Sequence, residues 1–342
     1  MGICVCALQG RGWLITNPTA GKGGCPSLSG SAETEKNMEI NEFAGKVCNA
    51  VGKKLGRAYK VEVREVQKNN GIVLHGLLIT ADSRNVIPTL YLEPFWEAYQ
   101  SGTTLAEIVR RLVKIYREEI PKASIDMDFF RQFAEVSGRI CYRLVRQGGN
   151  EMLLQDVPHI PFLDLAICFF YAYSSEILGE GAIRIHNSHM ELWDTSTKEL
   201  LELAQRNTPK LFPWRCNSME QVLREMMTEE EYRAENPEGR EVLFADNPLW
   251  VLSNAQRAYG ASCMIYPELL KQLAEKEERN FYILPSSIHE VILLADQGME
   301  TPEQLKDMIA EVNKTQVVAP EEVLSDSLYY YDFRKKNISI IF

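Results

Sequence analysis

The chain has 342 residues, of which 45% are hydrophobic, 9% aromatic and 25% charged. This composition is typical of a globular protein and excludes collagen-like, coiled-coil and wholly disordered chains. A chain of this length buries roughly three quarters of the surface that its unfolded form exposes, so its core needs neither a metal nor a disulfide. The 37 basic and 47 acidic residues give a net charge of −10, which argues against binding to phosphate backbones or anionic lipids. We therefore expect neither nucleic acid nor a membrane as a partner, and no cofactor.

The eight cysteines carry no metal-binding or redox signature. Cys4 and Cys6 form one close pair, but a second pair at zinc-binding spacing is missing. Five others are isolated and are expected to be small buried hydrophobic residues: Cys48, Cys141, Cys168, Cys216 and Cys263. Residues 1–14 have no signal-peptide pattern, and the most apolar later run, 160–173, is shorter than the roughly 20 residues of a membrane span. These features predict a cytoplasmic protein.

Residues 1–37 differ in character from the rest of the chain. Gly, Ser, Pro and Thr are frequent between Thr16 and Ser31, which predicts a flexible or non-native leader. From Met38 onward the apolar residues recur at helical spacing. The folded protein is therefore expected to begin near Met38.

Residues 38–135 are predicted to form an N-terminal α+β unit. After the first helix, residues 59–80 alternate with a period of two around the turn sequence Asn69-Asn70-Gly71, which predicts a β-hairpin. A third strand over 85–92 and a helix over 93–100 follow. Thr104 and Glu107 have the spacing of a capping box and predict a helix that ends near Pro121.

Residues 136–342 are predicted to form a C-terminal α+β portion of one domain or two. Strands are expected over 139–145, 152–155, 162–173 and 181–185, a helix over 267–275, and a hairpin from 281–284 and 291–295. Helix starts are indicated by capping boxes at Ser188, Ser196, Ser218 and Thr301. The predicted fold class is α+β, with antiparallel strands and hairpins, amphipathic helices, and no Rossmann or P-loop signature.

His186 and His189 form the one close histidine pair, with Glu191 and Asp194 nearby as oxygen donors. Such a set is compatible with a metal site. The favoured interpretation is that the two histidines flank a helix N-cap after a strand. A metal site at His186 and His189 is the alternative.

Other catalytic motifs are incomplete. The segment 15–24 resembles the phosphate-binding loop of diacylglycerol-type lipid kinases, but the Gly-Gly-Asp-Gly motif of those kinases is missing downstream. Gly260 and Ser262 begin a nucleophile elbow that lacks its last glycine, and His289-Glu290 lacks the second histidine of a zinc motif. Three carboxylates, Asp126, Asp128 and Asp164, were weighed as acid–base candidates without an indication of their geometry. Catalytic and ligand-binding residues are therefore unknown from sequence.

Aromatic residues are clustered at Tyr329-Tyr330-Tyr331 and at Trp96. Binding surfaces favour aromatic residues, so these clusters are candidate contact patches. Packing in a core or an edge strand is the favoured interpretation.

Four stretches together resemble an uncharacterised family of gut Firmicutes that is known only as a domain of unknown function and is distantly similar to the YtpQ family. They read KNNGIVLHGL at 68–77, PTLYLEPFWEAY at 88–99, YILPSSIHEV at 282–291 and VNKTQVVAPEEVLS at 312–325. The resemblance extends from about Met38 to the C-terminal region. It implies no activity, cofactor or catalytic residue.

Two functional hypotheses follow. The favoured one is a cytoplasmic, non-enzymatic bacterial module that binds a protein or a small molecule, because the sequence holds no complete catalytic motif. The alternative is a hydrolase that uses scattered carboxylates and a metal at His186 and His189.

Overall fold

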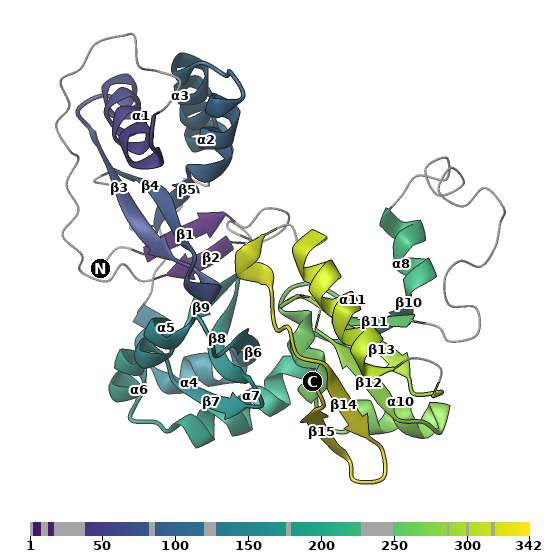
Figure 1. Cartoon of the computed structure of the whole chain (residues 1–342). Coiled ribbons are helices and arrows are strands. Elements are labelled where there is room, and N and C mark those ends of the chain that lie inside the picture. Colours follow the sequence, from purple (N-terminus) through teal and green to yellow (C-terminus); the bar gives the residue numbers. More distant parts are fainter. Residues whose placement is uncertain are drawn as a thin grey trace. The chain divides into compact units, whose positions relative to one another are not determined.

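The computed structural model describes residues 3–7, 13–16, 38–81, 86–119, 128–175, 179–226, 249–285, 287–298, 301–315 and 319–342 (Figure 1). The chain divides into two compact units. Unit 1 consists of Met1–Lys68, Ile72–Gln132 and Tyr171–Arg184, and unit 2 of Asn69–Gly71, Phe133–Phe170 and Ile185–Phe342. Helices and antiparallel strands occur in both units, which confirms the predicted α+β class. The predicted division into 38–135 and 136–342 stays a prediction.

Unit 1 is a sheet covered by helices. Its strands follow the order β3-β4-β5-β1-β2-β9, and β3 and β4 pair antiparallel as the predicted hairpin. Figure 1 shows α1 and α3 beside this hairpin. The strands are β1 (Ile3–Ala7), β2 (Trp13–Thr16), β3 (Tyr59–Gln67), β4 (Val73–Ala81), β5 (Val86–Tyr91) and β9 (Gly179–Arg184). The helices are α1 (Ile40–Leu55), α2 (Glu93–Gln100) and α3 (Leu105–Lys114), which continues as a π-helical turn over Ile115–Glu119.

The core of unit 1 follows from helical periodicity. Phe43, Val47 and Val51 lie on one face of α1 and are fully buried, because residues four apart share a face of a helix. Thr104 caps α3, since its hydroxyl accepts a hydrogen bond from the backbone N–H of Glu107 at 3.3 Å. The predicted helix starts at Met38 and Thr104 are thus confirmed to within two residues. Among the described helices of the chain, none has the length and apolarity needed to cross a membrane.

Two strands lie inside the predicted leader. β1 and β2 pair with each other, with Val5 opposite Ile15. The sequence analysis expected a flexible segment here and did not predict these strands. Residues 17–37, with most of the loop that resembles lipid kinases, lie outside the described residues. Whether residues 1–37 belong to the native protein stays a prediction.

Unit 2 begins with a small group of helices and strands. These are α4 (Phe133–Val136), β6 (Ile140–Arg146), α5 (Glu151–Asp156), β7 (His159–Phe162), β8 (Leu165–Ser175, of which unit 2 holds the part up to Phe170), α6 (Asn187–Trp193) and α7 (Thr197–Leu211). β7 and β8 form an antiparallel hairpin, and β6 is a neighbour of β8 in the sheet.

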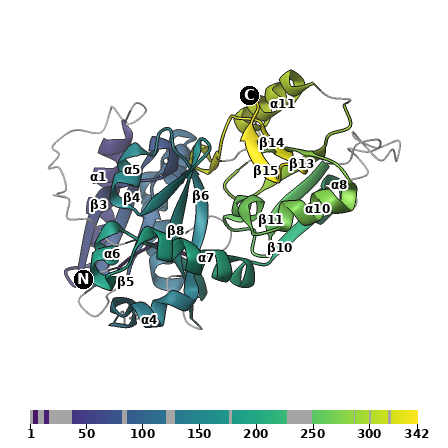
Figure 2. The ribbon, with the colours of Figure 1, turned by 90° about the horizontal axis from the view of Figure 1, so that it is seen from below.

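A six-stranded antiparallel sheet forms the rest of unit 2. Its order is β10-β11-β13-β12-β14-β15, with β10 (Trp214–Ser218), β11 (Leu249–Asn254), β12 (Phe281–Leu284), β13 (Val291–Ala295), β14 (Tyr329–Asp332) and β15 (Asn337–Ile340). Helices α10 (Leu269–Glu277) and α11 (Pro302–Thr315) lie on opposite faces of this sheet (Figure 2). The remaining short elements are α8 (Met219–Met226) and the 3-10 helices η6 (Gly260–Ile265) and η7 (Pro320–Glu322).

Strand alternation explains how this sheet supports both helices. Tyr282 and Leu284 of β12 pack with Leu305 and Ile309 of α11 in one cluster. Phe281 is also buried and points to the opposite face, because successive residues of a strand alternate. The predicted hairpin of 281–284 with 291–295 is confirmed by the pairing of β12 with β13.

One predicted strand of unit 2 is wrong. Residues 152–155 are helical and belong to α5. Asn150 is the N-cap of this helix after the Gly148-Gly149 turn. Four residues are too few to distinguish a helical from a strand period by apolar pattern.

A network of amide side chains holds the turn Asn69–Gly71 within unit 2. Asn70 has a left-handed backbone, with φ 61°, and its Nδ2 donates to the carbonyl oxygens of Pro320 and Val323, both at 2.8 Å. The Asn70 N–H donates to Oδ1 of Asn150 at 2.9 Å. Asn150 is fully buried and its Nδ2 donates to the carbonyl of Arg146 at 2.9 Å. Asn70 therefore connects its own turn with Asn150 and with the segment from Pro320 to Val323, which are far apart in sequence.

We predict that Asn150→Ala lowers the free energy of unfolding of unit 2 by about 1 to 3 kcal/mol, because it removes a buried side chain and leaves a part-buried N–H and a part-buried carbonyl without their partner. Urea unfolding followed by circular dichroism measures this loss. Asn187→Ala is the control, since the Asn187 side chain makes one exposed hydrogen bond, to the carbonyl of Gln155. Equal unfolding midpoints for the two variants would contradict the structural role of Asn150.

Candidate ligand site around Arg143

Strand β6 carries an arginine into the interior of unit 2. Ile140, Cys141, Leu144 and Val145 are buried, as expected for a strand with both faces covered. Arg143 stands among them and is only 4% exposed. Arginine keeps its charge inside proteins, so β6 places a positive charge in an apolar interior.

An aromatic ring contacts this charge, and two further rings follow it. The guanidinium carbon of Arg143 lies 4.9 Å from the centroid of the Tyr259 ring. The ring of Phe170 lies 5.4 Å from that of Tyr259, and the ring of Phe212 lies 5.7 Å from that of Phe170. A guanidinium over an aromatic face is attracted by the ring quadrupole.

Arg143 has no counter-charge in the described part of the chain. The described residues make no ion pair or hydrogen bond with its side chain, and Nε is fully enclosed without a partner. A buried charge costs several kcal/mol unless an anion offsets it, and a cation–π contact supplies only about 2 kcal/mol. The site therefore has the electrostatics of a receptor for an anion.

The Tyr259 ring is held by a strained loop. Arg257 and Tyr259 both have positive φ, at 51° and 55°, a conformation that costs energy for residues other than glycine. The buried Asn254 side chain closes the loop, because its Nδ2 donates to the carbonyl of Ala258 at 2.8 Å and its Oδ1 accepts from the Ala258 N–H at 3.2 Å. The loop is therefore fixed by specific bonds despite its strain.

His289 supports Tyr259 from a distant part of the sequence. The Tyr259 N–H donates to Nδ1 of His289 at 3.2 Å, and the two rings are stacked at 6.0 Å between centroids. Since Nδ1 accepts, the proton of the neutral ring is on Nε2, which lies 3.6 Å from a carboxylate oxygen of Glu322. Burial raises the pKa of the neighbouring Glu290 carboxyl. Acidic groups thus stand on the His289 side of the site.

Gly260 permits the close packing of this loop. A Cβ atom there would lie 2.3 Å from the Ser253 Oγ, 2.4 Å from the His289 carbonyl oxygen and 2.8 Å from the Asn254 backbone nitrogen. The Ser253 hydroxyl in turn donates to the His289 carbonyl at 2.7 Å. The sequence analysis considered Gly260 only as part of an incomplete nucleophile elbow, and the structure shows that its role is steric.

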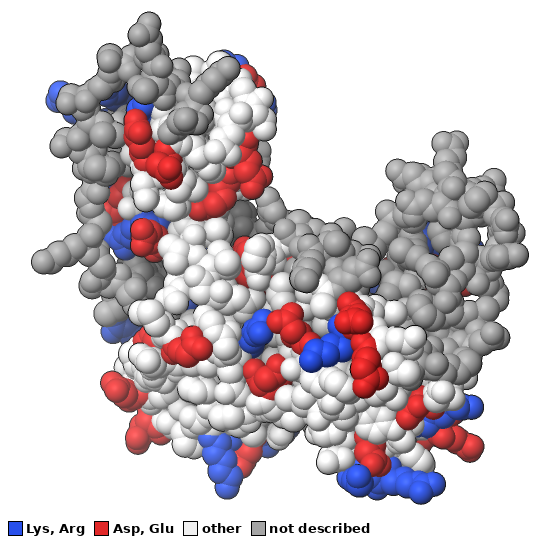
Figure 3. Space-filling view, viewed as in Figure 1, with Lys and Arg blue, Asp and Glu red and all other residues white. Residues whose placement is uncertain are grey.

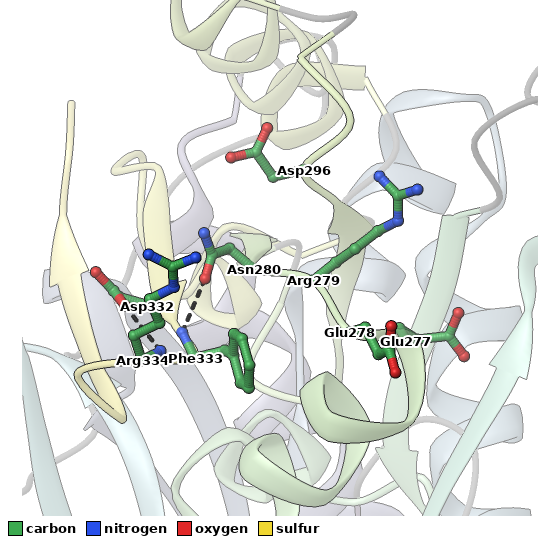
Figure 4. Close-up of a pocket in the computed structure, with 8 residues that line it drawn as sticks. All are labelled: Glu277, Glu278, Arg279, Asn280, Asp296, Asp332, Phe333 and Arg334. Carbon is green, nitrogen blue, oxygen red and sulfur yellow. Dashed lines mark hydrogen bonds between the residues drawn. The ribbon is translucent and has the colours of Figure 1, made fainter.

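A concavity lies at one end of strands β13, β12 and β14. It has a volume of about 630 Å³ and is lined by charged and polar residues (Figure 4): Glu277, Glu278, Arg279, Asn280, Asp296, Asp332, Phe333 and Arg334. Register places them together, since Phe281 lies opposite both Ala295 and Tyr331.

The carboxylates of this pocket already stabilise its own turns. Asp296 accepts from the Tyr330 hydroxyl at 2.6 Å. Asp332 accepts from the N–H groups of Arg334 and Lys335, both at 2.9 Å, and these bonds lower the pKa of its carboxyl against the opposing effect of desolvation. Ligand pockets are mostly apolar with a few convergent polar groups, so this charged and polar concavity is a poor candidate for a ligand site.

The structure places His186 and His189 at the start of α6. His186 is the N-cap, and its Nδ1 lies 2.7 Å from a carboxylate oxygen of Asp156. Its N–H donates to Nδ1 of His189 at 3.0 Å. The ring of His189 stacks on Trp193, and burial lowers its pKa to about 4. The favoured N-cap interpretation describes this arrangement. Within the described residues, no group of three or more His, Cys, Asp or Glu residues could hold a metal ion.

The predicted carboxylates do not share an arrangement in the described residues. Asp126 lies outside them, and Asp128 is an exposed residue at the start of a 3-10 helix in unit 1. Asp164 in unit 2 accepts hydrogen bonds from the hydroxyls of Ser325, Ser327 and Tyr329, at 2.5, 3.1 and 2.6 Å. These bonds tie the C-terminal segment to the turn between β7 and β8.

The aromatic clusters and cysteines pack as the favoured interpretations expected. Tyr329 and Tyr331 are buried, and Trp96 is partly buried against Phe43 with ring centroids 5.4 Å apart. Cys48, Cys141, Cys168 and Cys263 are buried, and Cys216 is half-buried. Burial raises the pKa of Cys141 and of Cys263 to about 12. Such thiols are inert.

Sequence reasoning missed Arg143 and Tyr259. A signal existed for Arg143, since it interrupts the run Ile-Cys-Tyr-Arg-Leu-Val over 140–145, which was predicted to be a strand. Tyr259 and His289 are 30 residues apart, and no local pattern links them. The pairing of β11 with β13 brings their segments together.

The fold and the site thus define an α+β protein whose second unit encloses an arginine without a described counter-charge. The chain matches the family of unknown function DUF5688 over residues 40–333 and belongs to it. This agrees with the predicted uncharacterised family. Comparisons with curated proteins and with solved structures gave no match.

We predict that Gly260→Ala lowers the free energy of unfolding by about 3 kcal/mol or more, because the new methyl group overlaps backbone atoms that cannot move independently. Gly138→Ala is the control, since a Cβ at Gly138 meets no atom within 4 Å. Urea unfolding compares the two variants. Similar midpoints would show that the loop from Ser253 to Gly260 is less tightly packed than described.

We predict that His189 makes unit 2 less stable in acid. Its pKa is about 4 in the folded protein and about 6.5 as a free side chain. Between these values the unfolded chain binds a proton that the folded chain does not, so stability is complete above pH 6.5 and falls toward pH 4. At pH 4.5 the loss is about 2 to 3 kcal/mol.

His189→Gln tests this pH dependence. Gln at the third helical position still accepts the N-cap N–H, as in a capping box, but does not titrate. The variant is expected to lose less stability than the wild type between pH 7 and pH 4.5 in urea unfolding. Asn187→Gln controls for a general effect on α6. If His189→Gln loses as much stability as the wild type between pH 7 and pH 4.5, His189 is not the cause of the acid sensitivity.

Proposed function

We propose that this chain is a non-enzymatic, cytoplasmic bacterial module that binds a small anionic ligand, and that Arg143 of unit 2 is its anchor. The observation that carries the proposal is a guanidinium that is 4% exposed and has no carboxylate partner in the described part of the chain. Buried charges in proteins are paired, so an external anion would complete this site.

The rigidity of the surroundings supports binding. Tyr259 is fixed by its bond to His289, and Gly260 fixes the loop against β11. A preorganised site loses less entropy when a ligand binds. The acidic character of the chain also suits a small ligand better than a polyanion. On the face seen in Figure 3, the basic side chains that the structure describes are interspersed with acidic ones.

The hydrolase alternative has less support. Asp164, His186 and His189 each make hydrogen bonds that hold their own segment. A general base instead needs a free position beside the reacting group. The proposal also includes a relationship to proteins of gut Firmicutes and to the YtpQ family. The family match by itself gives only a family of unknown function.

The proposal predicts that an anion co-purifies with the protein or binds to it through Arg143. Native mass spectrometry of the full chain, purified gently from a bacterial host, should show a bound small molecule that Arg143→Met loses. Thermal unfolding with organic sodium salts at constant ionic strength should show a rise of about 2 to 4 °C in Tm for the wild type and none for Arg143→Met.

Arg215→Met is the matched control, because Arg215 is an exposed arginine of the same unit. This variant should bind and respond like the wild type. Replacing a buried charge by an apolar side chain of similar length is often neutral or stabilising, so Arg143→Met is expected to fold. Identical responses of the wild type and Arg143→Met to every salt would refute the proposed function.

A further inference from the structure

We propose that the ligand of Arg143 is a small organic monocarboxylate whose body is aromatic or apolar. This inference rests on the proposed function and adds the chemical class of the ligand. Three features of the site carry it: the shape of the guanidinium, the rings beside it, and the acidic groups on the His289 side.

The cation favours a planar carboxylate. A guanidinium presents parallel N–H groups that match the two oxygens of a carboxylate. Nε of Arg143 is fully enclosed and has no partner among the described residues, which leaves the two Nη nitrogens as the donors for a ligand. The end of the fork is therefore where an anion would make its two hydrogen bonds. Phosphate sites use several cations or the N–H groups at the start of a helix. The Tyr259 ring, in contrast, contacts a single described guanidinium, that of Arg143.

The neighbouring rings favour an apolar body. Tyr259 is 7% exposed and Phe170 3% exposed, and Phe212 is half-buried beside Phe170. Of these three rings, Tyr259 contacts the guanidinium of Arg143, and Phe170 contacts Tyr259 in turn. A ligand anchored by Arg143 would therefore have the Tyr259 ring beside it, and an aromatic or apolar body gains from contact with such a ring.

The acidic neighbours favour a single negative charge. His289 is stacked on Tyr259, and its Nδ1 accepts a hydrogen bond, so the ring is neutral in this arrangement. Glu322 lies 3.6 Å from its Nε2, and Glu290 follows it directly in the chain. The Glu322 carboxylate on this side disfavours a second negative charge, so a dianion would be disfavoured beside one arginine.

Isothermal titration of the full chain with benzoate, benzamide, acetate and inorganic phosphate tests this class. Benzoate should bind about tenfold or more tightly than acetate, because acetate lacks the apolar body. Benzamide has the shape of benzoate without its charge and should give no saturable binding. Phosphate should give none either. Arg143→Met should abolish benzoate binding, and Arg215→Met should leave it unchanged.

Two variants separate charge from shape. Arg143→Lys keeps the charge but loses the fork, and should weaken benzoate binding about tenfold or more. Phe170→Leu removes the ring that contacts Tyr259 and should reduce the preference for benzoate over acetate. Equal binding of benzoate and benzamide would overturn the proposal that the ligand is a monocarboxylate.

The failures of the two proposals are distinguishable. Binding of phosphate that depends on Arg143, without binding of benzoate, would overturn the carboxylate class and leave the proposed function standing. A ligand without apolar body bound as tightly as benzoate would also overturn the class. Absence of Arg143-dependent binding for every probe, together with a fully folded Arg143→Met, would overturn both.

Discussion

The cation of Arg143 in an apolar strand is the constraint around which the second unit is arranged. β6 is covered on both faces, so its side chains cannot turn toward water as those of an edge strand can. The charge is therefore accommodated locally, by the face of Tyr259. Holding that face in place requires a loop with two non-glycine residues at positive φ. Strain in the loop and burial of the charge are consequences of one arrangement.

The same unit uses polar side chains in a different way elsewhere. Asn150 and Asp164 are satisfied within the protein, by the backbone of Asn70 and Arg146 and by the hydroxyls of Ser325, Ser327 and Tyr329. Fully satisfied buried networks specify one structure. Arg143 differs from these two residues. The Asp164 carboxylate and the Asn150 amide have hydrogen-bond partners within unit 2, whereas the Arg143 guanidinium has none among the described residues.

Local pattern predicted much of the fold. The spacing of Phe43, Val47 and Val51 was enough for α1, and the turn chemistry at Asn69–Gly71 was enough for the β3–β4 hairpin. The four residues of α5 that were predicted as a strand are too few to show a periodicity, and so are the five and four residues of the two leader strands. The site could not be predicted, since burial of Arg143 depends on neighbours distant in sequence. The contact between Tyr259 and His289 requires the register of β11 with β13.

The course of the chain through the two units has a consequence for biosynthesis. Unit 1 needs residues Tyr171–Arg184 for its last strand, and unit 2 already holds Asn69–Gly71 and ends at Phe342. Most of unit 1 is therefore synthesised well before the segment Tyr171–Arg184 that completes it. A cut near residue 132 leaves neither fragment with a whole unit. The two units are each compact but interleave in sequence, so neither can be produced whole from one uninterrupted stretch of the chain.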